Sequence, residues 1–239
     1  MRSDGRANDE LRKLSIKPNW NPYAEGSVDV SYGNTRILVT VSCEKEAPKW
    51  KEQGDVSGWI TAEYGMLPRA THTRNRREAT LAQQGGRTSE IQRLVGRSLR
   101  AAINTAEIPG LTFKIDCDVI IADGGTRTAS ISGAWVALYL ALQKAVETGL
   151  LSSLPRIDQI AAVSVGSVEG SKLLDLCYAE DSKAEFDLNL VFKQEGDIVE
   201  IQGTAEHKTI SVQDLTQLLG IGWAGVSKIM QEQRKVLGI

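Results

Sequence analysis

The sequence is poor in the residues that build redox and metal centres, because its 239 residues include three cysteines and two histidines. Cys43, Cys117 and Cys177 are widely spaced and lie in segments typical of apolar strands, which fits neither a disulfide framework nor a zinc site. We therefore expect reduced, buried thiols. His72 and His207 have the surroundings of surface or loop residues, and we assign a catalytic role to neither.

Long apolar runs are scarce as well. The N-terminal segment is charged, and we find no run of the length expected for a signal peptide or a membrane span. We expect a cytoplasmic protein with no membrane partner. Hydrophobic residues at 41% and charged residues at 24% are ordinary globular usage, which gives no compositional case for disorder. The length favours one compact domain over residues 1–239.

A large excess of one charge is also missing, since the formal net charge is −2. The distribution is nevertheless uneven between residues 69 and 100, where only Glu78 and Glu90 oppose a group of arginines. The group consists of Arg69, Arg74, Arg76, Arg77, Arg87, Arg93, Arg97 and Arg100. A solvated loop and helix face explains such a run about as well as nucleic-acid binding does, so other features must decide.

The first half of the chain predicts a hairpin, a long loop and a helix. Residues 27–32 and 36–43 alternate in polarity and are joined by the turn-forming pair Gly33-Asn34. Residues 45–88 have few apolar runs, which predicts a long loop of the kind that is functional or mobile. Apolar residues at helical spacing begin at Ile91, and Ser89 and Gln92 have capping-box spacing.

The second half predicts a strand at 113–122, the breaking sequence Asp123-Gly124-Gly125 and a helix at 129–146 that is apolar almost all round. Further strands are expected at 160–168, 172–178, 185–191 and 198–202, and helical structure at 212–236, broken near 220–222. Helices combined with mostly antiparallel strands predict an α+β or mixed α/β domain.

Gly124-Gly125-Thr126-Arg127 stands where the predicted strand passes into the predicted helix. Backbone N–H groups at such a turn can converge on an anion, with the helix dipole behind them. Thr126 can add a hydroxyl donor and Arg127 a charge-assisted pair. Tight packing alone explains most turns of this kind. A second glycine pair followed by Arg87, at another predicted helix start, strengthens the hypothesis of a phosphate site.

Acidic residues cluster between residues 180 and 187. Carboxylates such as Asp181 and Asp187 can hold Mg²⁺ near bound phosphates, or donate a proton to a leaving oxygen. An acidic loop beside a solvated strand face is the usual alternative for a cluster of this kind. The presence of two candidate phosphate loops in the same chain favours a role of these acids in catalysis or Mg²⁺ binding.

Six motifs resemble those of one enzyme family. They are Arg2-Ser3-Asp4-Gly5-Arg6, GWITAEYGMLPRAT at 58–71, GGRTSEIQRL at 85–94, ADGGTRTAS at 122–130, DLCYAEDS at 175–182 and VEIQGTAE at 199–206. On these motifs the chain resembles the bacterial ribonuclease PH enzymes over nearly its whole length. Residues 44–55 and the tail after residue 208 are less typical.

The resemblance implies an α+β fold like the second domain of ribosomal protein S5, with mixed sheets and packed helices, and a homohexamer built as a trimer of dimers. It implies phosphorolytic trimming of the 3′ ends of tRNA precursors and ribosomal RNA, with inorganic phosphate as co-substrate. The family pattern assigns phosphate binding to Arg87, Gly125, Thr126 and Arg127, and catalysis or Mg²⁺ binding to Asp181 and Asp187.

The family associates Arg69, Arg74 and Arg77 with RNA or with subunit assembly. We expect these residues, together with Arg93 and Arg97 on the arginine-rich helix, to guide a single-stranded 3′ end. Some stacking of bases on Trp59 or Tyr64 would add to this guidance, although we favour ordinary packing for Trp59. Raised salt should then weaken RNA binding.

Two alternative functions that involve no catalysis stay open. One is a non-catalytic RNA-binding or ring-forming subunit of an exosome-like assembly, and the other is a ribosome-associated scaffold of the same fold. Inactive ring subunits would be expected to lose the arginine or the acids, whereas Arg127, Asp181 and Asp187 are all present.

Overall fold

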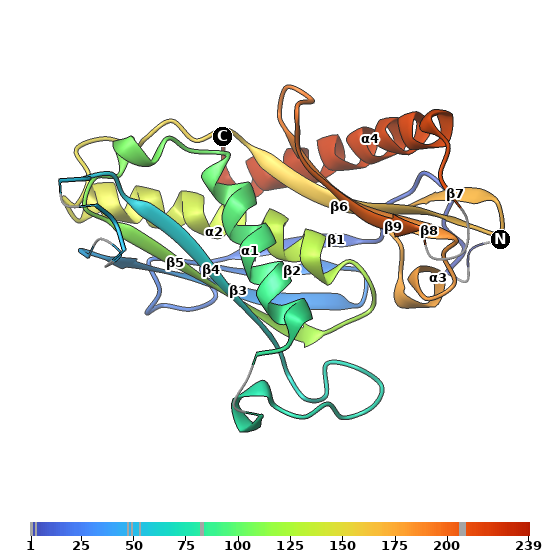
Figure 1. The fold of residues 1–239 in the computed structure, drawn as a ribbon. Helices are drawn as coiled ribbons and strands as arrows, with labels where there is room; N and C mark the ends of the chain where they lie inside the picture. The colour runs from blue at the N-terminus through green and yellow to red at the C-terminus, as the bar shows by residue number, and fades with distance from the viewer. Residues whose placement is uncertain are drawn as a thin grey trace.

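A computed structural model describes residues 2, 4–46, 48, 50–52, 54–81, 84–205 and 209–239 (Figure 1). His207 and Glu206 lie outside the described residues. The first of two sheets has five strands in the order β1-β2-β3-β5-β4. They are β1 (Leu14–Pro18), β2 (Gly26–Tyr32), β3 (Thr35–Glu44), β4 (Trp59–Met66) and β5 (Thr112–Ile121).

The predicted hairpin is confirmed, because β2 and β3 pair antiparallel with Val30 opposite Ile37. β1 adds to the free edge of β2, and the sequence did not reveal this five-residue strand. The expectation of a long loop over 45–88 is wrong for residues 59–66. They form β4, which runs parallel to β5. Ile60, Ala62 and Tyr64 point into the core, and small Ala62 weakens the apolar alternation that would have marked the strand.

The second sheet is antiparallel, with strand order β7-β6-β8-β9. Its strands are β6 (Ile160–Val168), β7 (Ser171–Leu174), β8 (Phe186–Lys193) and β9 (Ile198–Ala205). The strand expected at 172–178 ends at Leu174, since the short helix α3 (Tyr178–Asp181) follows almost at once.

Helix α2 (Thr126–Glu147) lies between the two sheets and packs against β2, β3 and β6 (Figure 1). By length and composition it could cross a membrane, contrary to our expectation that no such run exists. However, 72% of the apolar window is buried inside the molecule, as in a core helix. The almost continuous apolar surface that the sequence shows therefore contacts protein on both sides.

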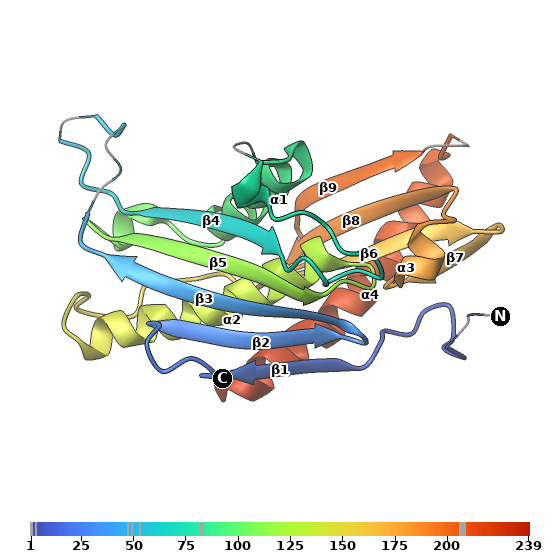
Figure 2. The same cartoon turned by 90° about the horizontal axis from the view of Figure 1, so that it is seen from below.

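Helix α1 (Gly86–Arg100) lies between β4 of the first sheet and β9 of the second (Figure 2). It begins before the predicted Ser89, with Gly85 as N-cap and no side-chain cap. The apolar residues that predicted this helix face the core, with Ile91, Leu94 and Leu99 buried.

Helix α4 (Val212–Leu237) covers the other face of the second sheet and is continuous, so the break predicted near residues 220–222 is wrong. Gly222 and Gly225 allow close packing instead, whereas a Cβ at Gly220 would meet no atom within 4 Å. A Cβ at Gly222 would lie 2.5 Å from Leu190 Cδ1, and one at Gly225 would lie 2.6 Å from Leu174 Cδ1.

The three cysteines are free, with Cys117 and Cys177 buried and Cys43 half-buried.

Candidate active site

One pocket of about 350 Å³ brings the predicted anion-binding residues and the predicted acids together. The N-terminal turns of α1 and α2 and the loop before α2 supply one side, and α3 and β8 supply the other. Its lining includes Arg87, Gly125, Thr126, Arg127, Asp181 and Asp187. A neighbouring hollow of about 390 Å³ shares both arginines and both aspartates and extends towards β9.

The loop between β5 and α2 has a backbone that only glycine adopts easily. Gly124 and Gly125 have φ values of 76° and 67°. A Cβ at Gly124 would lie 2.5 Å from the carbonyl oxygen of Leu176. Gly125 is the N-cap of α2 and provides no side-chain cap, so the first-turn N–H groups are open to an external acceptor.

Arg127 is held in place by an acid on the neighbouring helix. Its Nη2 lies 2.8 Å from Oε2 of Glu90, and Gln202 on β9 donates to Oε1 of the same carboxylate at 2.7 Å. Burial acts to raise the pKa of Glu90, but the hydrogen bonds from Arg127 and Gln202 outweigh it and lower that pKa overall. Nε of Arg127 is buried and has no hydrogen-bond partner among the described residues. A bound anion could supply one.

Asp181 ends α3, which is fixed to the glycine loop because the Tyr178 N–H donates to Oδ1 of Asp123 at 3.1 Å. Asp187 lies on β8 opposite Thr204 of β9. It shares a face of the strand with Asn189, and both line the pocket, whereas Leu188 between them is buried. The alternation of side chains along β8 therefore directs Asp187 to the pocket.

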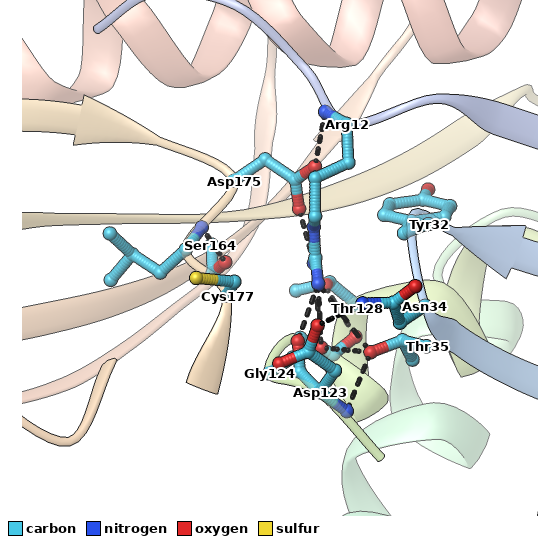
Figure 3. Close-up of polar contacts among 12 residues, drawn as sticks. Arg12, Tyr32, Asn34, Thr35, Asp123, Gly124, Thr128, Ser164, Asp175 and Cys177 are labelled. Carbon is cyan, nitrogen blue, oxygen red and sulfur yellow. Dashed lines mark hydrogen bonds and ion pairs between the residues drawn. The ribbon is translucent and has the colours of Figure 1, made fainter. Parts of the chain in front are cut away.

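Arg12 is a residue of the site that sequence reasoning missed. Its guanidinium pairs with Asp175 at 2.6 Å and also donates to the carbonyl oxygens of Asp123 and Gly124 (Figure 3). Arg12 and Asp175 are both buried. Asp175 has a φ of 54°, unusual for a residue with a side chain. No local pattern around Arg12 indicates this role, since its partners are distant in sequence.

The predicted RNA-binding arginines lie outside the pocket lining. Arg69, Arg74 and Arg77 are exposed in the segment after β4, and Arg69 lines an adjacent hollow with His72. Arg93 and Arg97 lie on the exposed face of α1, where Arg97 pairs with Glu200 at 2.7 Å.

Arg100, the last arginine of the group between residues 69 and 100, does not lie on the exposed face of α1 with Arg93 and Arg97. It donates to the Ile60 carbonyl oxygen at 2.8 Å, and its guanidinium lies 4.5 Å from the ring centroid of Trp59. Trp59 is therefore packed, in line with our preferred interpretation. Tyr64 is buried and its hydroxyl donates to Oγ1 of Thr126 at 3.0 Å, so the suggestion that a base stacks on Tyr64 is wrong. The exposed aromatic ring at the pocket is that of Tyr178.

The fold and the site define a class: an α+β protein in which two arginines and a glycine-rich helix N-terminus share a pocket with two aspartates. Residues 10–142 match domain 1, and residues 158–225 match domain 2, of the RNase PH 3′ exoribonuclease family. The chain belongs to this family of phosphorolytic exoribonucleases and has its α+β fold. A single domain over residues 1–239 stays a prediction.

Solved structures share the fold. Rrp46 from rice (Oryza sativa) superposes with a TM-score of 0.79 at 23% identity, covering 99% of this chain and 100% of that one. The Archaeoglobus fulgidus exosome with RNA bound to the active site gives a TM-score of 0.79 at 23% identity, covering 97% and 92%. An archaeal exosome core gives 0.77 at 22% identity, covering 98% and 91%.

Proposed function

We propose that this chain is a phosphate-dependent 3′-to-5′ exoribonuclease of the bacterial ribonuclease PH type. It trims the 3′ ends of tRNA precursors and ribosomal RNA in the cytoplasm and releases nucleoside diphosphates. In reverse it adds nucleotides from those diphosphates. The observation that carries the proposal is that Arg87, Arg127 and the glycine loop line the same pocket as Asp181 and Asp187.

In this mechanism inorganic phosphate binds between Arg87, Arg127 and the N-terminus of α2. One of its oxygens attacks the phosphorus of the last internucleotide bond, and the bond from that phosphorus to the 3′ oxygen of the preceding nucleotide breaks. The 3′ oxygen takes a proton and the terminal nucleotide leaves as a diphosphate. The arginines neutralise charge that develops on the transferred phosphoryl oxygens, which is the main task of protein groups in phosphoryl transfer.

We propose that the two acids would hold a magnesium ion. Asp181 and Asp187 both face the pocket, and no group of three or more His, Cys, Asp or Glu side chains suited to a metal is found among the described residues. Mg²⁺ is commonly held by one or two carboxylates together with substrate phosphates and waters. When bound, it would neutralise charge on the phosphates. The two carboxylates would hold it, or one of them would donate a proton to the leaving 3′ oxygen.

A non-catalytic ring subunit of an exosome-like assembly is the second candidate, because the structural neighbours include Rrp46 and exosome cores. Such a subunit needs a surface for RNA but no phosphate site. The joint placement of both arginines and both aspartates favours the enzyme. For the enzyme we propose a homohexamer, a trimer of dimers.

The test is an RNA with a single-stranded 3′ tail, incubated with and without inorganic phosphate in the presence of Mg²⁺. We expect nucleoside diphosphates that appear only when phosphate is present, because phosphate is the attacking group. Chromatography of the products distinguishes diphosphates from monophosphates. Monophosphates formed without phosphate would indicate hydrolysis, and RNA binding without any product would favour the non-catalytic subunit.

The exposed arginines after β4 give a separate prediction on binding. In the absence of phosphate, RNA affinity should fall steeply with salt. Replacing Arg74 and Arg77 with glutamine should reduce the slope of log K against log salt concentration by about 0.7 for each RNA phosphate that an arginine neutralises. Fluorescence anisotropy measures the slope, and Arg156→Gln, at a side chain that is 83% exposed, is a matched control. An unchanged slope in the double variant would exclude an interaction of these arginines with RNA phosphates.

A further inference from the structure

Arg12 enters the core from the segment before β1 and ends directly behind the glycine loop (Figure 3). Its Nη2 would lie 2.9 Å from a Cβ built on Gly125, which is closer than real Cβ atoms approach a neighbour. The guanidinium and the loop backbone are therefore in direct contact, and this contact is possible because residue 125 has no side chain. Arg12 itself is 5% exposed.

The hydrogen bonds of Arg12 fix the direction of two peptide groups. Nη1 donates to the carbonyl oxygen of Asp123 at 2.5 Å, and Nη2 donates to that of Gly124 at 3.4 Å. No cis peptide bond occurs among the described residues, so each carbonyl points opposite to the N–H of the same peptide group. Holding both carbonyls behind the loop turns the N–H groups of Gly124 and Gly125 to the pocket side.

Thr35 on β3 holds the same backbone from a second direction. Its Oγ1 donates to the Gly124 carbonyl oxygen at 2.6 Å and accepts from the Asp123 N–H at 3.0 Å. Thr35 is completely buried. It carries no charge, so it can influence a ligand in the pocket through the orientation of this backbone and through Arg12, whose Nη1 donates to its Oγ1 at 3.5 Å.

The positive charge of Arg12 contributes little to the pocket, because Asp175 balances it. Asp175 accepts from Nε, Nη2 and the backbone N–H of Arg12, and its side chain is 1% exposed. The buried pair is close to neutral as a unit. A planar guanidinium is needed because one group must bond to a carboxylate at one edge and to two carbonyls at the other, which a lysine ammonium cannot do.

We propose that Arg12 and Thr35 are positioning residues for phosphate: they lock the 123–125 backbone so that its N–H groups point at the anion. The inference rests on the proposed function in taking inorganic phosphate as the ligand. It concerns binding of phosphate and not the chemical step. A fixed array of N–H groups binds an anion without the cost of reorganising the loop.

Isothermal titration calorimetry with inorganic phosphate, without RNA, tests this directly on the full chain. Arg12→Lys should weaken phosphate binding roughly tenfold, the lower end of the effect found when a residue that orients the side chains binding a metal ion is replaced. Thr35→Val, which removes both hydrogen bonds of the hydroxyl to the loop, should weaken it about fivefold, the order of a net hydrogen-bond contribution. Arg36→Lys is the matched control, since Arg36 pairs with Asp29 and donates to no residue of the loop in the described structure.

Kinetics adds a readout that a merely structural role would not move. The KM for phosphate should rise in both variants while the KM for RNA stays near its wild-type value. If Arg12→Lys fails to fold, Thr35→Val still tests the inference. This variant is expected to fold, because it changes no charge and little volume. Equal phosphate affinity in folded Thr35→Val and wild type would overturn the inference, as would a wild type that binds no phosphate. A wild type that binds phosphate but releases no diphosphate, with weaker binding in the variants, would instead refute the proposed function alone.

Discussion

Replacing Arg127 with glutamine is expected to lower kcat/KM for phosphate-dependent release of nucleoside diphosphates about a thousandfold. Arg127 lines the pocket, and its buried Nε has no partner among the described residues, so it is available to a phosphate oxygen. The pairing with Glu90 fixes the plane of the guanidinium in advance. A neutral amide keeps some hydrogen bonding but cannot offset the charge on the transferred phosphoryl group. Steady-state kinetics on a tailed RNA measures the decrease.

Two further variants separate charge from geometry at this position. Arg127→Lys keeps the charge but loses the planar guanidinium with its paired N–H donors. Its activity should therefore fall between those of the wild type and the glutamine variant. Glu90→Gln leaves Arg127 intact but removes its partner, which should cost less than losing the arginine. The folded state should survive all three changes, because a pair with Glu90 at 38% side-chain exposure contributes no more than about 1 kcal/mol. Wild-type turnover in a folded Arg127→Gln would contradict the assigned role.

The part of the site that could be predicted from the sequence is the part encoded locally. Gly124, Gly125 and Arg127 stand within four residues at the change from strand to helix, and the local pattern predicts both the turn and its N–H groups. Asp187 and Asn189 follow the two-residue period of a strand. Short-range periodicity of this kind needs no knowledge of tertiary structure.

The remainder depends on contacts between distant segments. Asp175 is 163 residues from Arg12, and no spacing rule connects them. Gln202 and Glu90 meet because β9 lies beside α1, which follows only from the arrangement of both sheets. The wrong prediction of a break in α4 has the same cause. Gly222 taken alone suggests the end of a helix, whereas the structure shows that Leu190 packs where a side chain at this position would lie. Local patterns predicted which groups line the candidate site, whereas tertiary contacts decide how they are held.

Replacing Asp187 with asparagine is expected to lower kcat about a thousandfold. This is the order expected for the loss of either a proton donor or a carboxylate that holds a metal ion. Asparagine has the same shape, so β8 should keep its register and phosphate should still bind. The change removes the ability to bind a cation strongly and to give up a proton. Single-turnover measurements at saturating RNA and phosphate isolate the chemical step. Asp197→Asn, at an exposed aspartate in the turn between β8 and β9, is the matched control.

The same variant separates the two roles that Asp187 can have. If Asp181 and Asp187 together hold Mg²⁺, the double asparagine variant should be scarcely slower than the worse single variant, because residues that act as a unit are strongly non-additive. Raised Mg²⁺ should then restore part of the activity of each single variant. If Asp187 protonates the leaving oxygen alone, the two effects should multiply and magnesium should restore nothing. Unchanged single-turnover rates in Asp187→Asn would remove this carboxylate from the mechanism altogether, leaving the arginines and the glycine loop as a phosphate site without chemistry.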